Sequence, residues 1–191
     1  MKRMTILALS LIMLLTACGV PAPRAESGTA APGAPAGPAT LSSFTAVDLD
    51  GNEVDESIFA DYDLTMINIW ATFCGPCLSE MPALGELAAE YADKGVRIVG
   101  IVADVPQNSD GSHDSDMVST ARNLVQITGA EYLHLLPGAD LYEAILNQVS
   151  VVPETIFVDN AGNIIDKPYF GARSKNDWAS VIDKYLPEVR S

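Results

Sequence analysis

Cys74 and Cys77 lie three residues apart in the segment WATFCGPCLSEMP, residues 70–82, and the 191-residue chain has only one further cysteine, Cys18. A structural disulfide framework in an exported protein needs more cysteines than these. Structural zinc needs four ligands, and only two cluster here. Redox exchange remains, because a cysteine at a helix start faces unpaired backbone N–H groups and the positive end of the helix dipole, which favour its thiolate.

The elements around the pair set the expected roles of the two thiols. A mostly apolar run over residues 64–70 is typical of a strand buried on both faces, and it ends just before the cysteines. Apolar residues then recur at three- and four-residue steps, which predicts a helix from about Cys74 with a kink at Pro82. We therefore expect Cys74 to be exposed and nucleophilic. Cys77, one turn later, should be more buried and should resolve the mixed disulfide.

The rest of the pattern predicts a mixed α/β sheet between helices, because strands alternate with helices before a hairpin and a last helix. Asp50-Gly51 is a hairpin turn signal, and Asp140 is expected to cap a helix. The expected strands cover residues 44–49, 52–54, 96–102, 132–136, 155–159 and 163–166, and the expected helices cover 55–60, 116–128, 140–148 and 175–186.

Other metal-binding side chains do not form a recognisable pattern. The only histidines are His113, in a polar loop, and His134, on an expected strand, and we interpret them as solvated and packed respectively. Asp110, Asp114 and Asp116 lack the spacing of a calcium loop. We therefore predict no metal site.

The N-terminus predicts export. Residues 1–17 combine a positive start with a short apolar run, which is typical of a secretion signal rather than a membrane span. Small residues followed by Cys18 resemble a bacterial lipobox, in which the chain is cut before the cysteine and the thiol is lipidated. An ordinary signal peptide with a chance cysteine is the alternative.

Residues 18–40 are predicted to be a tether, and residues 41–191 the folded domain. The tether is almost all Ala, Pro and Gly, and a flexible chain of this length reaches on the order of 25 Å. Without residues 1–17 the chain has 11 − 2 = 9 basic and 25 acidic residues, a net charge of −16. Such a surface repels nucleic acid, so no nucleic-acid partner is expected.

Three separated segments resemble the thioredoxin superfamily, and within it the membrane-anchored TlpA/ResA-like thiol-disulfide oxidoreductases. They are residues 68–77, residues 151–155 and the hairpin at 48–51, and the resemblance extends from about Leu41 to Leu186. It implies a thioredoxin fold, a mixed central sheet flanked by helices, with an N-terminal β-hairpin extension. It implies no cofactor.

The resemblance also implies a substrate-binding surface around the dithiol. Pro153 would be a cis-proline facing the disulfide, and the backbone of Val152 would pair with an incoming client strand. The residues that we assign to this surface are Trp70, Phe73, Gly75, Pro76, Val152, Pro153 and Glu154.

Glu80 is the third candidate catalytic residue, with Cys74 and Cys77. Thioredoxin has a buried aspartate where this chain has Asn68, and in the TlpA/ResA-like branch a glutamate on the active-site helix is implicated instead. Glu80 matches it, one turn beyond Cys77. The alternative is a surface acid that compensates the helix dipole.

Two further differences concern client contact. Phe73 replaces the more usual tryptophan before the first cysteine, which would alter substrate fit. Glu154 follows the cis-proline, where a negative charge would disfavour the Cys74 thiolate and select positively charged partners. Alternatively, Glu154 points to solvent.

The predicted function is reduction of disulfides in extracytoplasmic client proteins by a lipid-anchored monomer. In the family, a transmembrane thiol carrier supplies the electrons, and clients include apocytochrome c awaiting haem and oxidised repair enzymes. Two alternatives stay open. A copper-delivery module on this fold usually has wider cysteine spacing and a distal histidine. A thiol peroxidase needs a lone reactive cysteine in a Pro/Thr-rich loop, which we do not find.

Overall fold

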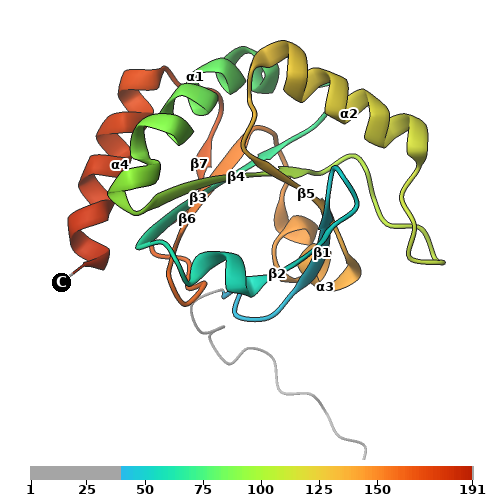
Figure 1. Ribbon diagram of the computed structural model, residues 1–191, viewed down its shortest axis with the longest axis horizontal. Coiled ribbons are helices and arrows are strands. Elements are labelled where there is room, and N and C mark those ends of the chain that lie inside the picture. The colour runs from blue at the N-terminus through green and yellow to red at the C-terminus, as the bar shows by residue number, and fades with distance from the viewer. Residues whose placement is uncertain (1–39, 191) are drawn as a thin grey trace, which may run out of the picture. The chain divides into compact units, whose positions relative to one another are not determined.

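The computed structural model describes residues 40–190, so the predicted signal segment, Cys18 and the predicted tether up to residue 39 lie outside the described residues. Within that range the strands form one seven-stranded sheet in the order β2-β1-β5-β4-β3-β6-β7 (Figure 1). Helices cover both of its faces. The mixed α/β architecture predicted from the sequence is therefore confirmed.

The centre of the sheet carries the cysteine segment. β3 (Leu64–Trp70) runs parallel to β4 (Val96–Val102) and antiparallel to β6 (Glu154–Asp159), and β4 pairs in parallel with β5 (Leu133–Pro137). All seven residues of β3 are buried, as its apolar sequence predicts for a strand covered on both faces.

The N-terminal hairpin is also confirmed. β1 (Thr45–Asp48) and β2 (Glu53–Asp55) pair antiparallel, and β1 continues the sheet at the edge formed by β5. The turn between them places Gly51 at φ +87°, a left-handed backbone conformation that glycine adopts without strain. The expected helical turn after the hairpin is a short 3-10 helix, η1 (Glu56–Phe59).

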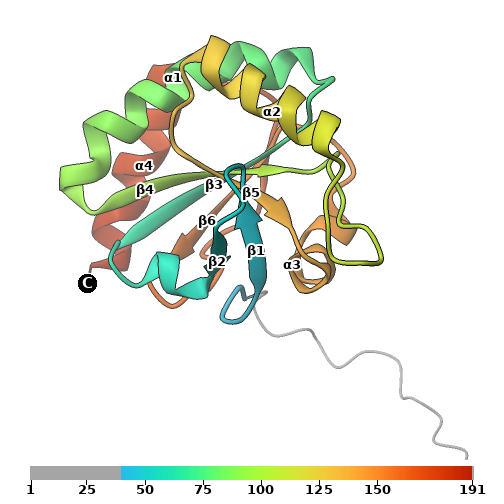
Figure 2. The ribbon, with the colours of Figure 1, turned by 45° about the vertical axis from the view of Figure 1, so that its right-hand side comes forward.

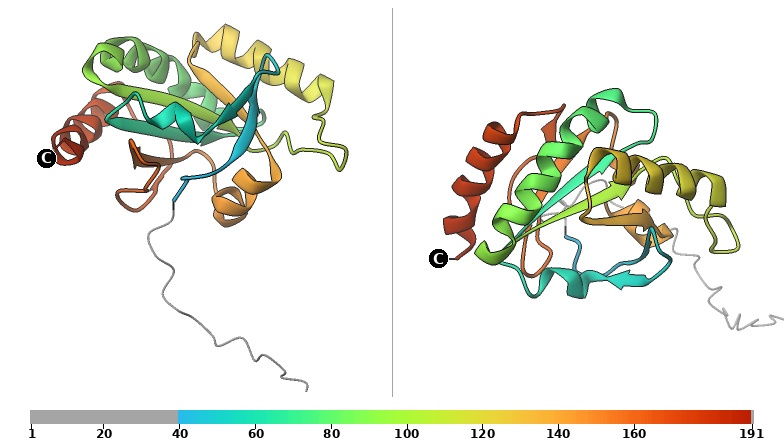
Figure 3. Two further views of the ribbon diagram at one scale, coloured as in Figure 1. Left: turned by 60° about the horizontal axis from the view of Figure 1, so that its bottom comes forward. Right: turned by 45° about the horizontal axis from the view of Figure 1, so that its top comes forward.

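Three long helices lie on one face of the sheet and a short one lies on the other (Figures 1 and 2). The long helices are α1 (Gly75–Tyr91), α2 (Ser115–Thr128) and α4 (Lys175–Val189), and α4 lies beside α1 (Figure 3). Over residues 40–190, none of the helices is long and apolar enough to cross a bilayer. The remaining short elements are α3 (Ala139–Ala144), η2 (Ala92–Lys94) and η3 (Leu146–Gln148).

The predicted cap of the third helix is wrong. The helix begins at Ala139 after Gly138, and it ends at Ala144 before a 3-10 turn rather than running to residue 148. Asp140 Oδ2 instead accepts hydrogen bonds from the backbone nitrogen and the hydroxyl of Thr45, at 2.7 and 3.0 Å. A contact with β1, 95 residues away, thus takes one oxygen of the carboxylate, while Oδ1 accepts a hydrogen bond from the backbone nitrogen of Leu141 at 2.8 Å.

The predicted hairpin at residues 155–166 is only half right. Its turn forms, and Asp159 accepts hydrogen bonds from the backbone nitrogens of Ala161 and Asn163. The return arm forms isolated bridges, Ile164 with Val158 and Asn163 with Thr40, instead of a strand. β7 (Tyr169–Phe170) is the strand that pairs with β6. The return arm leaves the sheet where Asp166 accepts a hydrogen bond from the Tyr185 hydroxyl of α4.

Candidate active site

Cys74 and Cys77 form a disulfide at the N-terminus of α1, with an S–S distance of 2.04 Å. Cys74 is the N-cap residue, and its Sγ accepts a hydrogen bond from the backbone nitrogen of Cys77 at 3.2 Å. Pro76 fits the first helical turn, where a missing backbone donor costs nothing. In the reduced protein the same N–H group would stabilise a Cys74 thiolate.

Cys77 is buried as expected, but Cys74 is more buried than expected. Cys77 is 0% exposed, as a resolving cysteine should be, but Cys74 is only 5% exposed rather than open to solvent. Ala71 and Pro153 are buried as well. Cys74 is therefore less accessible to a client disulfide than the sequence predicts.

The segment that contains the proline lies against the disulfide, as the resemblance implies. The Val152–Pro153 peptide bond is cis. The carbonyl oxygen of Val152 is 3.6 Å from Cys74 Sγ. Residues 78 positions apart in the chain are thus brought together at the reactive sulfur.

Glu80 is not a surface acid. Its side chain is 2% exposed, so the alternative of a dipole-compensating residue in solvent is wrong. Glu80 Oε1 accepts a hydrogen bond from Asn68 Nδ2 at 2.9 Å. Its other oxygen, Oε2, accepts hydrogen bonds from Trp178 Nε1 and from the backbone nitrogen of Arg173, both at 3.0 Å.

The surroundings of Glu80 change its proton affinity. Burial is the largest effect and raises the pKa of the carboxyl above its ordinary value of 4.5, while the hydrogen bonds from Trp178, Arg173 and Asn68 partly offset the rise. Asn68, in the place of thioredoxin's aspartate, adds no second charge and also donates to Thr155 Oγ1 at 3.1 Å. The site therefore has one buried carboxyl that can gain and lose a proton, one helical turn from Cys77.

The assignment of Trp70 to the client surface is wrong. The side chain is 0% exposed, because it packs beneath the disulfide in the same apolar cluster as both cysteines. Its indole Nε1 donates to His134 Nδ1 at 3.1 Å, and His134 Nε2 lies 2.8 Å from the carbonyl oxygen of Ala130. Trp70 can thus influence the site only by supporting it.

His134 is packed, as predicted, but its bond to Trp70 was not foreseen from the sequence. Burial lowers the pKa of His134 to about 4, so its ring is neutral at physiological pH. The ring lies over Gly100, where an added Cβ atom would be 2.1 Å from Nδ1. A glycine facing a histidine across paired strands was the only available signal of this contact.

Asp104 is a further site-adjacent residue that sequence reasoning missed. Its carboxylate accepts hydrogen bonds from the backbone nitrogen of Thr72 at 3.0 Å and from the Thr72 hydroxyl at 2.5 Å. These bonds hold the turn between β3 and the cysteines. Nothing in the local pattern pointed to Asp104, since it lies 32 residues from Thr72.

The outer surface of the site is partly apolar. Phe73 is 79% exposed, and Gly75 and Pro76 are exposed beside it. Phe73 also lines a cavity of about 310 Å³, together with Tyr142 and Val152. Of the residues assigned to the client surface, Phe73, Gly75, Pro76 and the half-buried Val152 are therefore accessible as proposed client contacts, whereas Pro153 and Glu154 are buried.

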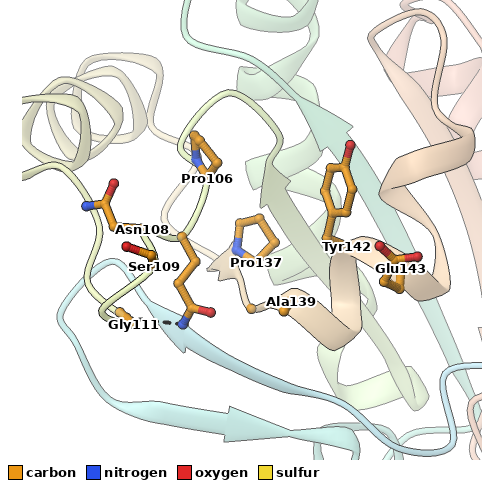
Figure 4. A pocket seen from close by; sticks show the side chains of 10 residues that line it. Pro106, Asn108, Ser109, Gly111, Pro137, Ala139, Tyr142 and Glu143 are labelled. Carbon is orange, nitrogen blue, oxygen red and sulfur yellow. Dashed lines mark hydrogen bonds between the residues drawn. The ribbon is translucent and has the colours of Figure 1, made fainter.

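A larger cavity of about 550 Å³ lies between the loop over residues 106–111 and α3 (Figure 4). It shares Tyr142 with the smaller cavity beside Phe73. His113 follows the loop and is half-buried, with Nε2 3.2 Å from the carbonyl oxygen of Pro137, so its predicted solvation is only partial. Among residues 40–190, no group of three or more His, Cys, Asp or Glu side chains could hold a metal ion.

Glu154 does not point to solvent, which was one of its two predicted orientations. Its side chain is 7% exposed and lies on the sheet face that α3 covers, opposite the face that holds Glu80. Burial raises the pKa of this carboxyl as well. Two buried acids thus lie on opposite faces of the sheet, Glu80 on the face that α1 covers and Glu154 on the face that α3 covers.

The chain is similar in sequence to known proteins. A family model described as Redoxin matches residues 26–173. The chain is 37% identical over 147 residues to the thiol-disulfide oxidoreductase ResA of Bacillus cereus, covering 75% of each chain. It is 32% identical to the ResA protein of Halalkalibacterium halodurans, over 76% of this chain and 75% of that one.

Solved structures agree on the fold. The thiol:disulfide interchange protein of the thioredoxin family from Chlorobium tepidum has a TM-score of 0.63 at 24% identity, over 80% of this chain and 99% of that chain. The predicted thioredoxin fold and the resemblance to ResA-like proteins are therefore confirmed.

Proposed function

Because the chain belongs to the Redoxin family and is a thiol-disulfide oxidoreductase, we propose that it works as a reductant of disulfides in extracytoplasmic client proteins. The Cys74–Cys77 pair at the start of α1 supplies both electrons. The observation that carries the direction of the reaction is the charge around this pair: two buried carboxyls and no histidine or other cation within the motif.

The exchange takes place in two balanced steps. The Cys74 thiolate attacks one sulfur of the client disulfide, which forms a mixed disulfide and releases the second client sulfur as a thiolate that takes up a proton. The Cys77 thiolate then attacks Cys74 Sγ, which releases the first client sulfur and leaves the Cys74–Cys77 disulfide. Two electrons pass to the client.

Glu80 is proposed to exchange the proton of Cys77. A fully buried thiol loses its proton to bulk water slowly, and Glu80 is a buried carboxyl on the same helix whose raised pKa lets it hold a proton closer to neutral pH. Asn68 and Trp178 orient the carboxylate through their hydrogen bonds. They are positioning residues for this step.

The direction follows from thiolate stability. Strong oxidants of this fold stabilise the thiolate of the first cysteine and reach about −120 mV, whereas thioredoxin, with Gly-Pro between its cysteines, lies near −270 mV. That gap is worth about 7 kcal/mol at about 1.4 kcal/mol per 30 mV. Here the motif is Gly75-Pro76, and the carboxylates of Glu80 and Glu154 disfavour a negative charge on sulfur.

The proposed location is extracytoplasmic, with lipid on Cys18 as the anchor to a bacterial cell membrane and the Ala/Pro/Gly-rich tether leading to the domain. The electron donor would be a transmembrane thiol carrier, and apocytochrome c or oxidised repair enzymes would be clients. The resemblance of residues 1–18 to a lipoprotein signal supports this address. The partners rest on family likeness alone.

Equilibrating the Cys74–Cys77 pair with glutathione and dithiothreitol series tests the direction. We expect a potential near that of thioredoxin, about −270 mV. Pro76→His, which introduces a cation into the motif, serves as the matched control and should shift the potential upward. A wild-type value more positive than about −180 mV, the range of disulfide isomerases, would overturn the proposed reductase.

A further inference from the structure

A third cavity, distinct from the two described above, is lined by the acidic residues Glu154 and Asp166. It has a volume of about 390 Å³ and lies between β6, β7 and the segment that follows α3. Glu154 lies at its centre in the sheet, paired with Ile69 of β3 on one side and with Phe170 of β7 on the other. The remaining walls are mostly aliphatic, from Ile145 and Ile156.

The carboxylate in this cavity has no counter-charge. Within residues 40–190, no hydrogen bond or ion pair to the Glu154 side chain is present, and no lysine or arginine lines the cavity. Burying a carboxylate without a partner is costly, and a raised pKa is the expected consequence. The second acid on the wall, Asp166, is already engaged by the Tyr185 hydroxyl and by Lys184 Nζ at 3.7 Å.

A short stretch of chain connects this cavity to the reactive sulfur. Glu154 follows Val152 by two residues, a span of at most about 7 Å in an extended chain, and the Val152 carbonyl oxygen is 3.6 Å from Cys74 Sγ. Ser150 lines both this cavity and the smaller one beside Phe73. A client strand at Val152 therefore passes within side-chain reach of Glu154.

We propose that this cavity binds a lysine or arginine side chain of the client, a few residues from the client cysteine that Cys74 attacks. The inference rests on the proposed function and adds a substrate preference to it. The Glu154 carboxylate would pair with the cation, the isoleucine side chains would cover its aliphatic stem, and the half-exposed Phe170 ring would flank it. The net charge of −14 favours the approach of basic segments.

The test uses pairs of synthetic peptide disulfides that differ at one position, lysine against the uncharged norleucine, scanned over three residues on each side of the reactive cysteine. The rate constant for oxidation of the reduced protein is measured by stopped flow. At one position we expect the lysine peptide to react at least tenfold faster, which corresponds to about 1.4 kcal/mol. Because the ratio compares two substrates of one enzyme, any change in the potential of the dithiol cancels.

Glu154→Gln should reduce that ratio to about one. Glu143→Gln is the matched control, because it removes the same charge from an exposed position on α3 (Figure 4) and should preserve the ratio. Gln148→Lys provides a second variant if Glu154→Gln fails to fold. Gln148 is an exposed residue that lines the cavity. A lysine at this position would form an ion pair with the Glu154 carboxylate and abolish the preference for the lysine peptide.

The outcomes separate the two proposals. If neither peptide is reduced, the proposed reductase function fails. If the wild type reduces both peptides equally, or if Glu154→Gln keeps the lysine preference, the cavity does not bind a basic side chain of the client. Strong binding of free cadaverine without any preference among peptides would assign the cavity to a small amine and overturn the inference.

Discussion

Replacement of Glu80 separates its proposed chemical role from its structural one. Glu80→Ala would leave two donors unpaired, the buried indole N–H of Trp178 and the part-buried backbone N–H of Arg173. At about 1–3 kcal/mol for a buried donor, and less for a part-buried one, the free energy of unfolding should fall by at most about 6 kcal/mol. The Asn68 amide loses less, because it also donates to Thr155.

Glu80→Gln should retain more stability than Glu80→Ala. The glutamine oxygen can keep the two donors at the Oε2 position, and its new N–H group can face Asn68 Oδ1 after the Asn68 amide rotates. That rotation takes the Asn68 N–H₂ group away from its acceptors, so we expect the free energy of unfolding to fall by about 1–3 kcal/mol. The rate of client reduction should nevertheless fall by about 10²-fold near neutral pH, the usual loss on removing a general acid–base group.

The pH dependence of stability gives an independent readout for Glu80. Its folded pKa lies above the ordinary 4.5, so the wild type gains stability as the pH falls through the folded pKa and loses it as the pH rises. Glutamine does not titrate. The stability of Glu80→Gln relative to wild type should therefore be greatest at neutral pH and should decline on acidification towards pH 4.5.

The assay is single-turnover reduction of a protein disulfide from pH 5 to 9, with urea unfolding at each pH. Glu86→Gln is the control, because it makes the same change at an exposed position of α1. An unchanged rate and pH profile in Glu80→Gln would refute the proton role. A relative stability that rises on acidification would refute the inferred pKa direction.

Three further predictions concern the support of the site and its address. Gly100→Ala should lower the free energy of unfolding in urea by about 1–3 kcal/mol, because the new Cβ would lie 2.1 Å from His134 Nδ1. An unchanged free energy of unfolding would contradict this, because it would show that β4 and β5 shift at no cost. The pKa of His134 falls from 6.5 to about 4 on folding, so its stabilising contribution should be lost as the pH falls from 6.5 to 4, and His134→Gln should lack that part of the acid sensitivity. An identical pH profile for His134→Gln and wild type would contradict the buried, neutral ring. Cys18→Ser should release the protein from membranes and leave the domain active, whereas a wild type that washes off as readily in salt and carbonate would show that Cys18 carries no lipid.

The elements that hold the cysteines were predictable because their determinants are local. A mostly apolar run identifies a doubly covered strand, apolar residues at three- and four-residue steps identify a helix, and Asp-Gly marks a hairpin. These rules correctly placed β3, α1 and the N-terminal hairpin. They failed at Asp140, where a contact with Thr45 takes the predicted cap.

The environment of the site was decided by tertiary structure. Spacing put Glu80 one turn from Cys77, but its burial depends on Trp178, 98 residues away, so the sequence left the surface alternative open. Strand register likewise places Glu154 opposite Ile69, so that the Glu154 side chain lines a cavity on the face of the sheet that α3 covers. Side-chain spacing along one element specifies which face a residue occupies, whereas its proton affinity depends on what the rest of the chain packs against that face.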